Sequence, residues 1–129
     1  MNELKDNNSL NNQVLLIDDN PDQLTLIRLL LESKNYKVIC ANGSKEAFNC
    51  LEETEVDVIV CDVMMPDISG PEFIEKLRTS EKFANVPVIM ITAGCNESEV
   101  DLLLSGADLL CNKKDMNRLL TSQIKLLLS

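Results

Sequence analysis

The chain of 129 residues carries 12 Lys and Arg against 21 Asp and Glu, which gives a formal net charge of -9, and only 3% of its residues are aromatic. This length suits one domain with one sizeable core, which must be built from Leu, Ile and Val. The negative charge argues against direct binding of nucleic acid, because phosphate backbones attract clusters of Lys and Arg. No apolar stretch reaches the roughly 18 residues that a membrane span needs, so no membrane contact is expected.

Residues 1–12 are polar and lack the basic-then-apolar order of a secretory signal, so they are expected to form a flexible tail. The chain has five cysteines and no histidine. The cysteines contain no CxxC pair and their number is odd, which favours reduced thiols in a cytoplasmic protein. The lack of histidine excludes a Ser-His-Asp or Cys-His catalytic set and His-based zinc sites, unless another chain supplies the imidazole.

Short apolar runs of strand-like composition alternate with amphipathic stretches along the chain. In chain order they predict a strand at 13–18, a helix from 20 to about 35, a strand at 36–40, a helix at 43–53, a strand at 56–61, a helix after the loop 65–70, a strand at 86–91, a helix from about 96 to 105, a strand at 107–111 and a helix at 116–128. Residue types mark two helix ends: Asn20-Pro21 suits an N-cap and first helical position, and Gly106 suits a C-cap.

The strict alternation of five strands and five helices predicts an α/β fold with a parallel sheet and helices on both faces. Right-handed crossovers make a doubly wound arrangement the default. No linker or internal repeat is visible, so residues 13–129 are expected to form one domain, without a separate output domain in this sequence.

Polar side chains stand where several of these strands end. Asp18 and Asp19 follow the first strand, Asp62 the third, Thr92 the fourth and Lys113 the fifth. In a parallel sheet these side chains emerge at one edge, where open α/β sheets bind their ligands. Two unit charges ~4 Å apart repel by roughly 4 kcal/mol at an effective dielectric constant near 20. A hard divalent cation with oxygen ligands relieves this repulsion, so the pattern predicts a metal-dependent acidic site.

These residues match a known family, and the chain resembles the receiver domain of bacterial two-component response regulators over 14–128. The matching segments are LIDDN at 16–20, VCDVMMP at 60–66, Gly70, ITA at 91–93, GAD at 106–108 and Lys113. Each segment alone is weak evidence, whereas all of them in order and at family-like intervals are strong evidence. The resemblance implies a flavodoxin-like sheet with strand order 2-1-3-4-5.

The resemblance also implies a role for each residue at the strand ends. Asp62 resembles the phosphoacceptor, a carboxylate nucleophile that forms an acyl phosphate. Asp19 resembles a direct ligand of Mg²⁺ and Asp18 a ligand that acts mainly through water; Asp62 and the backbone carbonyl of Met64 complete the protein's share of the coordination sphere. Thr92 and Lys113 are suited to hydrogen-bond and pair with the oxygens of the transferring phosphoryl group.

The partners implied by the resemblance are a histidine kinase or a histidine phosphotransfer protein, which would donate the phosphoryl group. The responsive surface would be residues 96–128, which would bind a downstream protein, an output domain or a second copy in a homodimer. Such a domain promotes its own phosphorylation and dephosphorylation and is otherwise not an enzyme.

Two positions depart from the family pattern. The family usually has an aromatic residue three positions before the lysine, where this chain has Leu110, so signal transmission through that ring is in doubt. The family lysine is usually followed by proline, often after a cis peptide bond, whereas Lys114 follows here. A cis bond without proline costs about 3–4 kcal/mol, which favours a trans bond. The spacing from Gly106 favours Lys113 as the family lysine, whereas the spacing from Thr92 also allows Lys114.

Three other functions remain as alternatives. A receiver-like interaction module without phosphorylation is compatible with the two departures. An aspartyl-nucleophile phosphatase requires a second acid two residues after the nucleophile. That position holds Met64 after Asp62 and Asn20 after Asp18. A flavodoxin-like cofactor carrier needs a loop of small residues after the first strand, and the chain has Asp-Asp-Asn-Pro there.

Overall fold

The structure, a computed structural model, describes residues 12–93 and 99–129. Five parallel strands form one sheet in the order β2-β1-β3-β4-β5, which confirms the predicted fold class. The strands are β1 (Gln13–Ile17), β2 (Lys37–Ala41), β3 (Val58–Asp62), β4 (Val88–Thr92) and β5 (Leu109–Asn112). None of the described helices is both long and apolar enough to cross a bilayer.

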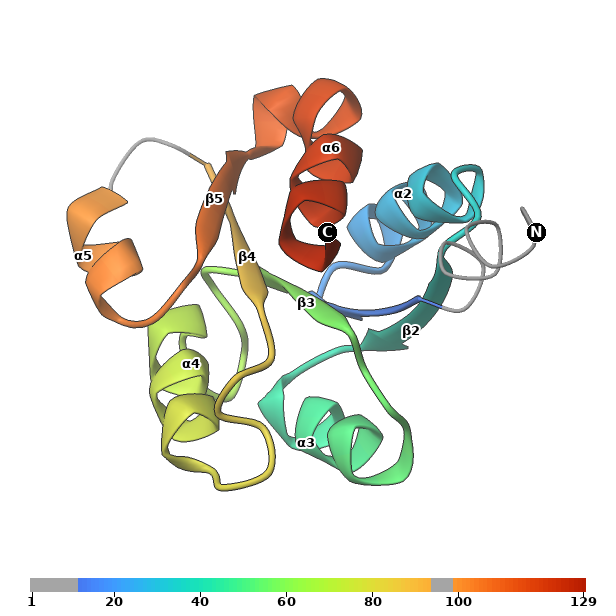
Figure 1. Cartoon of the computed structure of the whole chain (residues 1–129). Coiled ribbons are helices and arrows are strands. Elements are labelled where there is room, and N and C mark those ends of the chain that lie inside the picture. The colour runs from blue at the N-terminus through green and yellow to red at the C-terminus, as the bar shows by residue number, and fades with distance from the viewer. Residues whose placement is uncertain (1–11, 94–98) are drawn as a thin grey trace.

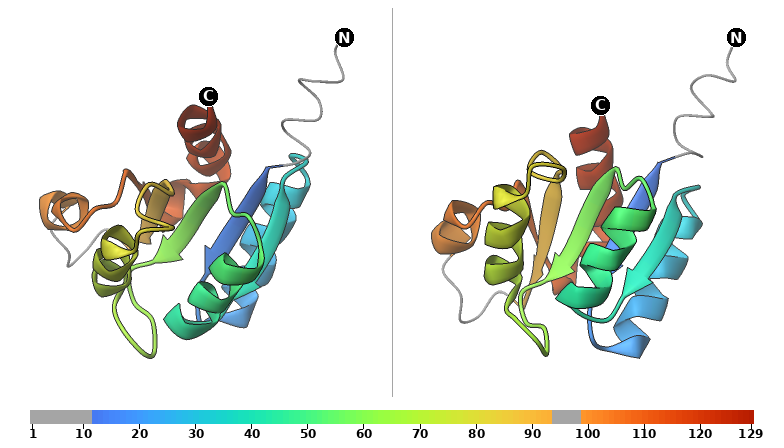
Figure 2. Two further views of the ribbon diagram at one scale, coloured as in Figure 1. Left: turned by 60° about the horizontal axis from the view of Figure 1, so that its bottom comes forward. Right: turned by 90° about the horizontal axis from the view of Figure 1, so that it is seen from below.

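Helices cover both faces of this sheet (Figure 1). They are α2 (Pro21–Glu32), α3 (Ser44–Glu53), α4 (Gly70–Thr79), α5 (Glu99–Leu104) and α6 (Met116–Leu128), with a short 3₁₀ turn, η1 (Lys113–Asp115), before α6. Helices α2 and α6 lie on one face and α3 and α4 on the other, while α5 lies beside the edge strand β5. Figure 2 shows the strands running in one direction behind α3 and α4, as a doubly wound fold requires.

Successive side chains of each strand enter two separate cores. In β1, Leu15 and Ile17 pack into the core under α3 and α4, whereas Val14 and Leu16 pack into the core under α2 and α6. All four side chains are fully buried. Strands buried on both faces need apolar residues at every position, which is why β1 and β3 appear in the sequence as continuous apolar runs.

The third and fourth strands begin two residues later than their predicted starts at 56 and 86. Before β4, the N–H of Val86 donates to the carbonyl of Phe83 in a turn, and Pro87 has no N–H to donate, so the ladder begins at Val88. Strand β1 begins at its predicted start and ends one residue early, whereas β2 and β5 differ from their predicted bounds by one or two residues at each end. The predicted start of a helix near residue 96 lies outside the described residues.

The predicted helix ends at Asn20 and Gly106 are confirmed. The side chain of Asn20 accepts hydrogen bonds from the N–H groups of Asp22 and Gln23, with Pro21 at the first helical position. Gly106 has a φ of 118°, which only glycine adopts readily, and its N–H donates to the carbonyl of Leu103 at the end of α5.

Arg78 of α4 forms hydrogen bonds at the edge of the sheet opposite Asp18 and Asp62. Its guanidinium donates to the carbonyls of Ala84 (3.0 Å) and Val86 (2.6 Å), which lead into β4. It also donates to the carbonyl of Gly106 (2.9 Å) and to the carboxylate of Asp108 (2.9 Å), which lead into β5. One side chain therefore joins a helix to the starts of two strands.

We expect Arg78→Met to destabilise the domain strongly, because it keeps the apolar stem and leaves several polar groups without their donor. The loss in free energy of unfolding should be about 2–4 kcal/mol, measured by urea denaturation. Arg118→Met is the matched control, since Arg118 pairs with Asp115 on the surface and its side chain is 71% exposed. The control should lose no more than about 0.5 kcal/mol. Equal losses in the two variants would contradict this account of Arg78.

Candidate functional site

The carboxyl ends of the three central strands bring the acids and the threonine to one edge of the sheet. Asp18 follows the last residue of β1, and Asp62 is the last residue of β3. Ile17 pairs with Cys61, so Asp18 and Asp62 occupy corresponding positions on neighbouring strands. On the other side of β3, Thr92 lies one position beyond the residue of β4 that pairs with Asp62.

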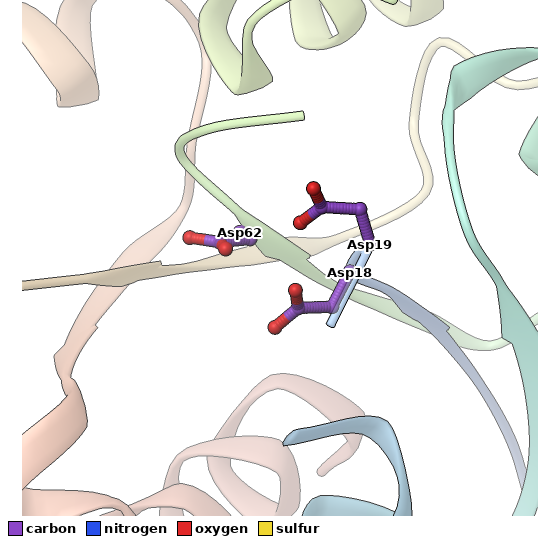
Figure 3. A group of neighbouring side chains, drawn as sticks. All are labelled: Asp18, Asp19 and Asp62. Carbon is purple, nitrogen blue, oxygen red and sulfur yellow. The ribbon is translucent and has the colours of Figure 1, made fainter. Parts of the chain in front are cut away.

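The three carboxylates form one cluster (Figure 3). Each of Asp18, Asp19 and Asp62 offers an oxygen that lies within 4.8 Å of the other two. Figure 3 shows their side chains gathered at the carboxyl ends of β1 and β3. Asp18 and Asp62 are buried, with exposed fractions of 3% and 9%, whereas Asp19 is exposed. The cluster is therefore open to solvent on the side of Asp19.

The surroundings of Asp18 disfavour its negative charge. Burial raises the pKa of Asp18 to about 6, from an ordinary value of 3.8. The backbone N–H of Asn20, which donates to Asp18 over 3.0 Å, lowers the pKa again, and the charge of Asp62 raises it. Lys113 has a smaller lowering effect and Asp19 a smaller raising effect. Asp18 therefore holds a proton more readily than an isolated aspartate does.

Of the two candidate lysines, Lys113 lies beside the acids. Its Nζ is 3.9 Å from Oδ2 of Asp62, and its side chain is 41% exposed. Strand β5 ends at Asn112, whose side chain accepts a hydrogen bond from the N–H of Lys114 and starts the turn η1. The turn was not predicted. The Lys113–Lys114 peptide bond is trans, as the lack of proline predicts.

The two remaining predicted site residues lie at the same edge of the sheet. Thr92 ends β4 and is 3% exposed. Met64 lies two residues after Asp62, in the loop between β3 and α4, and its side chain is 67% exposed. Gly70 closes this loop: its N–H donates to Val63 over 2.6 Å, and a Cβ there would lie only 2.6 Å from the carbonyl oxygen of Asp62. A side chain at position 70 would therefore displace the backbone of the acidic site.

Sequence reasoning missed the contact between Asp67 and Ser44. Asp67 lies in the same loop, and its carboxylate accepts a 2.6 Å hydrogen bond from the hydroxyl of Ser44 at the start of α3. One signal for this contact exists in the sequence: the N-cap position of α3 is Gly43, which has no side chain to cap the helix. A helix start without its own cap needs an acceptor from elsewhere in the chain.

The cluster has the chemistry of a site for a small, hard cation. Three carboxylates offer oxygen ligands, the preferred donors for Mg²⁺. The cluster contains no thiol or imidazole that would favour zinc or copper instead. A cation in this place would offset the repulsion among the acids, and the ammonium of Lys113 beside Asp62 would attract an anionic group.

Comparisons with known proteins agree with this geometry. The chain is 39% identical over 101 residues to hybrid signal transduction histidine kinase D of Dictyostelium discoideum. This match covers 78% of this chain and 6% of that protein. It is 34% identical over 120 residues to the transcriptional regulatory protein CpxR of Escherichia coli, covering 91% of this chain and 49% of CpxR. The chain thus spans half the length or less of these curated relatives.

A solved structure has the same fold: the receiver domain of the sensor histidine kinase PA1611 from Pseudomonas aeruginosa superposes with a TM-score of 0.82. That domain is 24% identical and was solved with a magnesium ion in its active-site cleft; the alignment covers 91% of this chain and 97% of that one. The family model of the response regulator receiver domain matches residues 14–125. On these grounds the chain belongs to the response regulator receiver domain family.

Proposed function

We propose that this chain is a phosphorylation-dependent signalling switch that accepts a phosphoryl group on Asp62 from a histidine kinase or a histidine phosphotransfer protein. The observation that supports this proposal best is the gathering of Asp18, Asp19 and Asp62 at one sheet edge, with the ammonium of Lys113 beside Asp62. Because the chain contains no histidine, the donor imidazole lies outside this sequence.

In the proposed transfer, a carboxylate oxygen of Asp62 attacks phosphorus while the P–N bond of the donor breaks, and the electron pair of that bond stays on the imidazole nitrogen. Negative charge is spread over the equatorial oxygens of the transferring group. Lys113 supplies a positive charge for one of these oxygens, and the hydroxyl of Thr92 a hydrogen bond for another. The partial exposure of Lys113 leaves its side chain free to follow the incoming group.

Asp18, Asp19, Asp62 and the backbone carbonyl of Met64 would hold a magnesium ion. The carboxylates suit it, because their oxygens lie within 4.8 Å of one another and a cation would offset the negative charges crowded there. When bound, the cation supplies positive charge that offsets the acids and the phosphoryl oxygens. Mg²⁺ keeps several waters in octahedral coordination, which agrees with the exposure of the cluster on the Asp19 side.

Members of the family interact with histidine kinases and output domains, and the proposed output surface of this chain is 96–128, of which 99–128 are described. Its helix α5 exposes Val100 and Leu104, with exposed fractions of 63% and 78%. Leu110 of β5 packs against the core at the position of the usual aromatic residue, and its carbonyl accepts a hydrogen bond from Gln123 of α6. We propose that phosphorylated Asp62 biases this surface toward a downstream protein, an output domain or a second copy.

We propose no turnover of external substrates, so the chain would promote only its own phosphorylation and dephosphorylation. The position two residues after Asp62, where an aspartyl phosphatase has its second acid, is occupied by Met64. A cytoplasmic location is part of the proposal, since Cys40, Cys50, Cys61 and Cys111 are free thiols, which persist in a reducing compartment.

The test is a magnesium titration with and without a phosphoryl mimic, followed by the amide NMR spectrum. Millimolar Mg²⁺ should shift the signals of residues around Asp19 and Asp62 first. Beryllofluoride should then shift Thr92 and β5. At a concentration 100-fold above its dissociation constant, Mg²⁺ should add about 2.7 kcal/mol to the free energy of unfolding.

The competing functions give different results in the same experiment. A receiver-like module that is never phosphorylated would show no change with beryllofluoride and no labelling by acetyl phosphate. A phosphatase would release phosphate from a small phosphomonoester with many turnovers. Either result, or a lack of any response to millimolar Mg²⁺, would contradict the proposed function.

A further inference from the structure

The first turn of α3 is capped by a side chain from a distant loop. Helix α3 begins after Gly43, and its first N–H groups, those of Ser44 and Lys45, donate to Oδ2 of Asp67 over 3.1 and 3.3 Å. The Ser44 hydroxyl adds a 2.6 Å hydrogen bond to the same oxygen. A Cβ on Gly43 would lie 3.2 Å from Oδ1 of Asp67, so this carboxylate fills the place of an ordinary N-cap side chain.

The Asp67 carboxylate accepts hydrogen bonds from three backbone N–H groups, those of Ser44, Lys45 and Ile68, and from the Ser44 hydroxyl. Hydrogen bonds from Ser44 and from the backbone of Ile68 and Lys45 hold the pKa of Asp67 well below its usual range, the Ser44 hydroxyl having the largest effect. The carboxylate therefore stays ionised, and its charge faces the positive end of the α3 dipole. Ser44 is buried, so the contact is fixed on the α3 side.

Asp67 lies in the middle of loop 63–69, which also carries Met64. The two ends of this loop are held by backbone hydrogen bonds, from Val63 to Ile91 (3.2 Å) and from Gly70 to Val63 (2.6 Å). In the described part of the chain, residues 64–66 make no hydrogen bond to another segment. The Asp67 carboxylate is therefore the polar contact that holds the middle of the loop against the rest of the domain.

We propose that Asp67 is a positioning residue for the magnesium site: by tying loop 63–69 to the start of α3, it sets the placement of Met64 relative to Asp62 and Asp19. This inference rests on the proposed function, in which the Met64 carbonyl is a ligand. Asp67 itself does not belong to the ligand cluster. Coupling is reciprocal, so bound Mg²⁺ would in turn strengthen the contact between Asp67 and Ser44.

The test measures the dissociation constant of Mg²⁺ by calorimetry on the unphosphorylated full chain, together with urea denaturation. We expect Asp67→Ala to weaken Mg²⁺ binding about tenfold, near the lower end of typical coupling between sites. Ser44→Ala keeps the Asp67 charge and removes only the shortest hydrogen bond, so it should weaken binding about threefold, which separates positioning from long-range charge.

A double variant separates positioning from helix capping. In Gly43→Ser with Asp67→Ala, the new serine can cap α3 in the space that the carboxylate leaves, since the backbone at position 43 is extended and any residue can adopt it. The free energy of unfolding should recover while Mg²⁺ binding stays weak. Recovery of both, or a normal Mg²⁺ dissociation constant in Asp67→Ala, would overturn the inference.

Asp57→Ala is the matched control at the opposite edge of the sheet. Its carboxylate accepts a 2.7 Å hydrogen bond from the N–H of Gln13, so the variant should lose stability without changing the Mg²⁺ dissociation constant. A change in this control equal to that of Asp67→Ala would also overturn the inference. If the unaltered chain binds no Mg²⁺ at millimolar concentration, the proposed function itself fails, which is a distinct result.

Discussion

Asp62→Asn is expected to take no label from acetyl phosphate, while its metal-free form unfolds at a higher temperature than the unaltered chain. An amide oxygen lacks the negative charge that makes the carboxylate a nucleophile, so the acyl phosphate cannot form. The same change removes one of three crowded acids, two of which are buried. Loss of function and gain of stability should therefore appear together.

The gain in free energy of unfolding should be about 1–2 kcal/mol, because the repulsion between Asp62 and Asp18 exceeds the benefit of the long contact with Lys113. For a domain of this size, that is a rise of about 5 °C in melting temperature. Labelling is measured by mass spectrometry, which detects the added phosphoryl group, and stability by calorimetry in EDTA.

Lys113→Met serves as the comparison for Asp62→Asn. It removes a positive charge from the site, so labelling should become slow but remain detectable, and the metal-free domain should gain no stability. Labelling of Asp62→Asn at the normal rate would place the phosphoacceptor elsewhere. A loss of stability in Asp62→Asn would mean that Asp62 is satisfied by contacts in the metal-free fold.

The acidic site could be predicted from the sequence because parallel strands impose their own geometry. Once 13–18 and 56–61 are identified as neighbouring parallel strands, Asp18 and Asp62 must emerge at the same edge, because the carboxyl ends of parallel strands meet there. Hydrophobic periodicity predicts where the strands lie in the sequence, and their parallel pairing predicts which edge of the sheet their ends share. No knowledge of the loops is needed for this part of the site.

The loop contacts could not be predicted in this way. The hydrogen bond between Ser44 and Asp67 joins residues 23 positions apart, and no periodic pattern connects a loop to a helix start. The spacing from Gly106 favoured Lys113 over Lys114, but the apolar run did not indicate the turn that Asn112 starts after β5. The start of β4 could not be predicted from the apolar run either, because it depends on a single backbone donor, which Pro87 lacks.

Asp18→Asn is expected to stabilise the metal-free chain at neutral pH but not at low pH. The pKa of Asp18 is raised to about 6 in the folded chain from 3.8, so the folded state binds a proton more tightly than the unfolded state. Below both values Asp18 is protonated in both states and has no effect. As the pH rises from about 4 to 6, the free energy of unfolding falls, and it stays lowered at higher pH.

The full cost of ionised Asp18 above pH 6 corresponds to about 3 kcal/mol by linkage. Asparagine removes this cost, and its amide oxygen can still accept the hydrogen bond from the N–H of Asn20. Urea denaturation in EDTA should therefore show the variant about 3 kcal/mol more stable at pH 7.5 and equal to the unaltered chain near pH 3.5.

Magnesium should narrow this difference in stability, because the ion binds the ionised acids that destabilise the metal-free fold. At 10 mM Mg²⁺ and pH 7.5, the unaltered chain should gain more stability than Asp18→Asn, which has lost one negative ligand. Glu81→Gln, at an exposed turn position, is the control and should show the same stability as the unaltered chain at pH 7.5 and at pH 3.5. Two results would contradict this account: a stability gain in Asp18→Asn that persists at pH 3.5, or one that Mg²⁺ does not reduce. Either would show that the variant is stabilised by packing around position 18 and that the charge of Asp18 is not the cause.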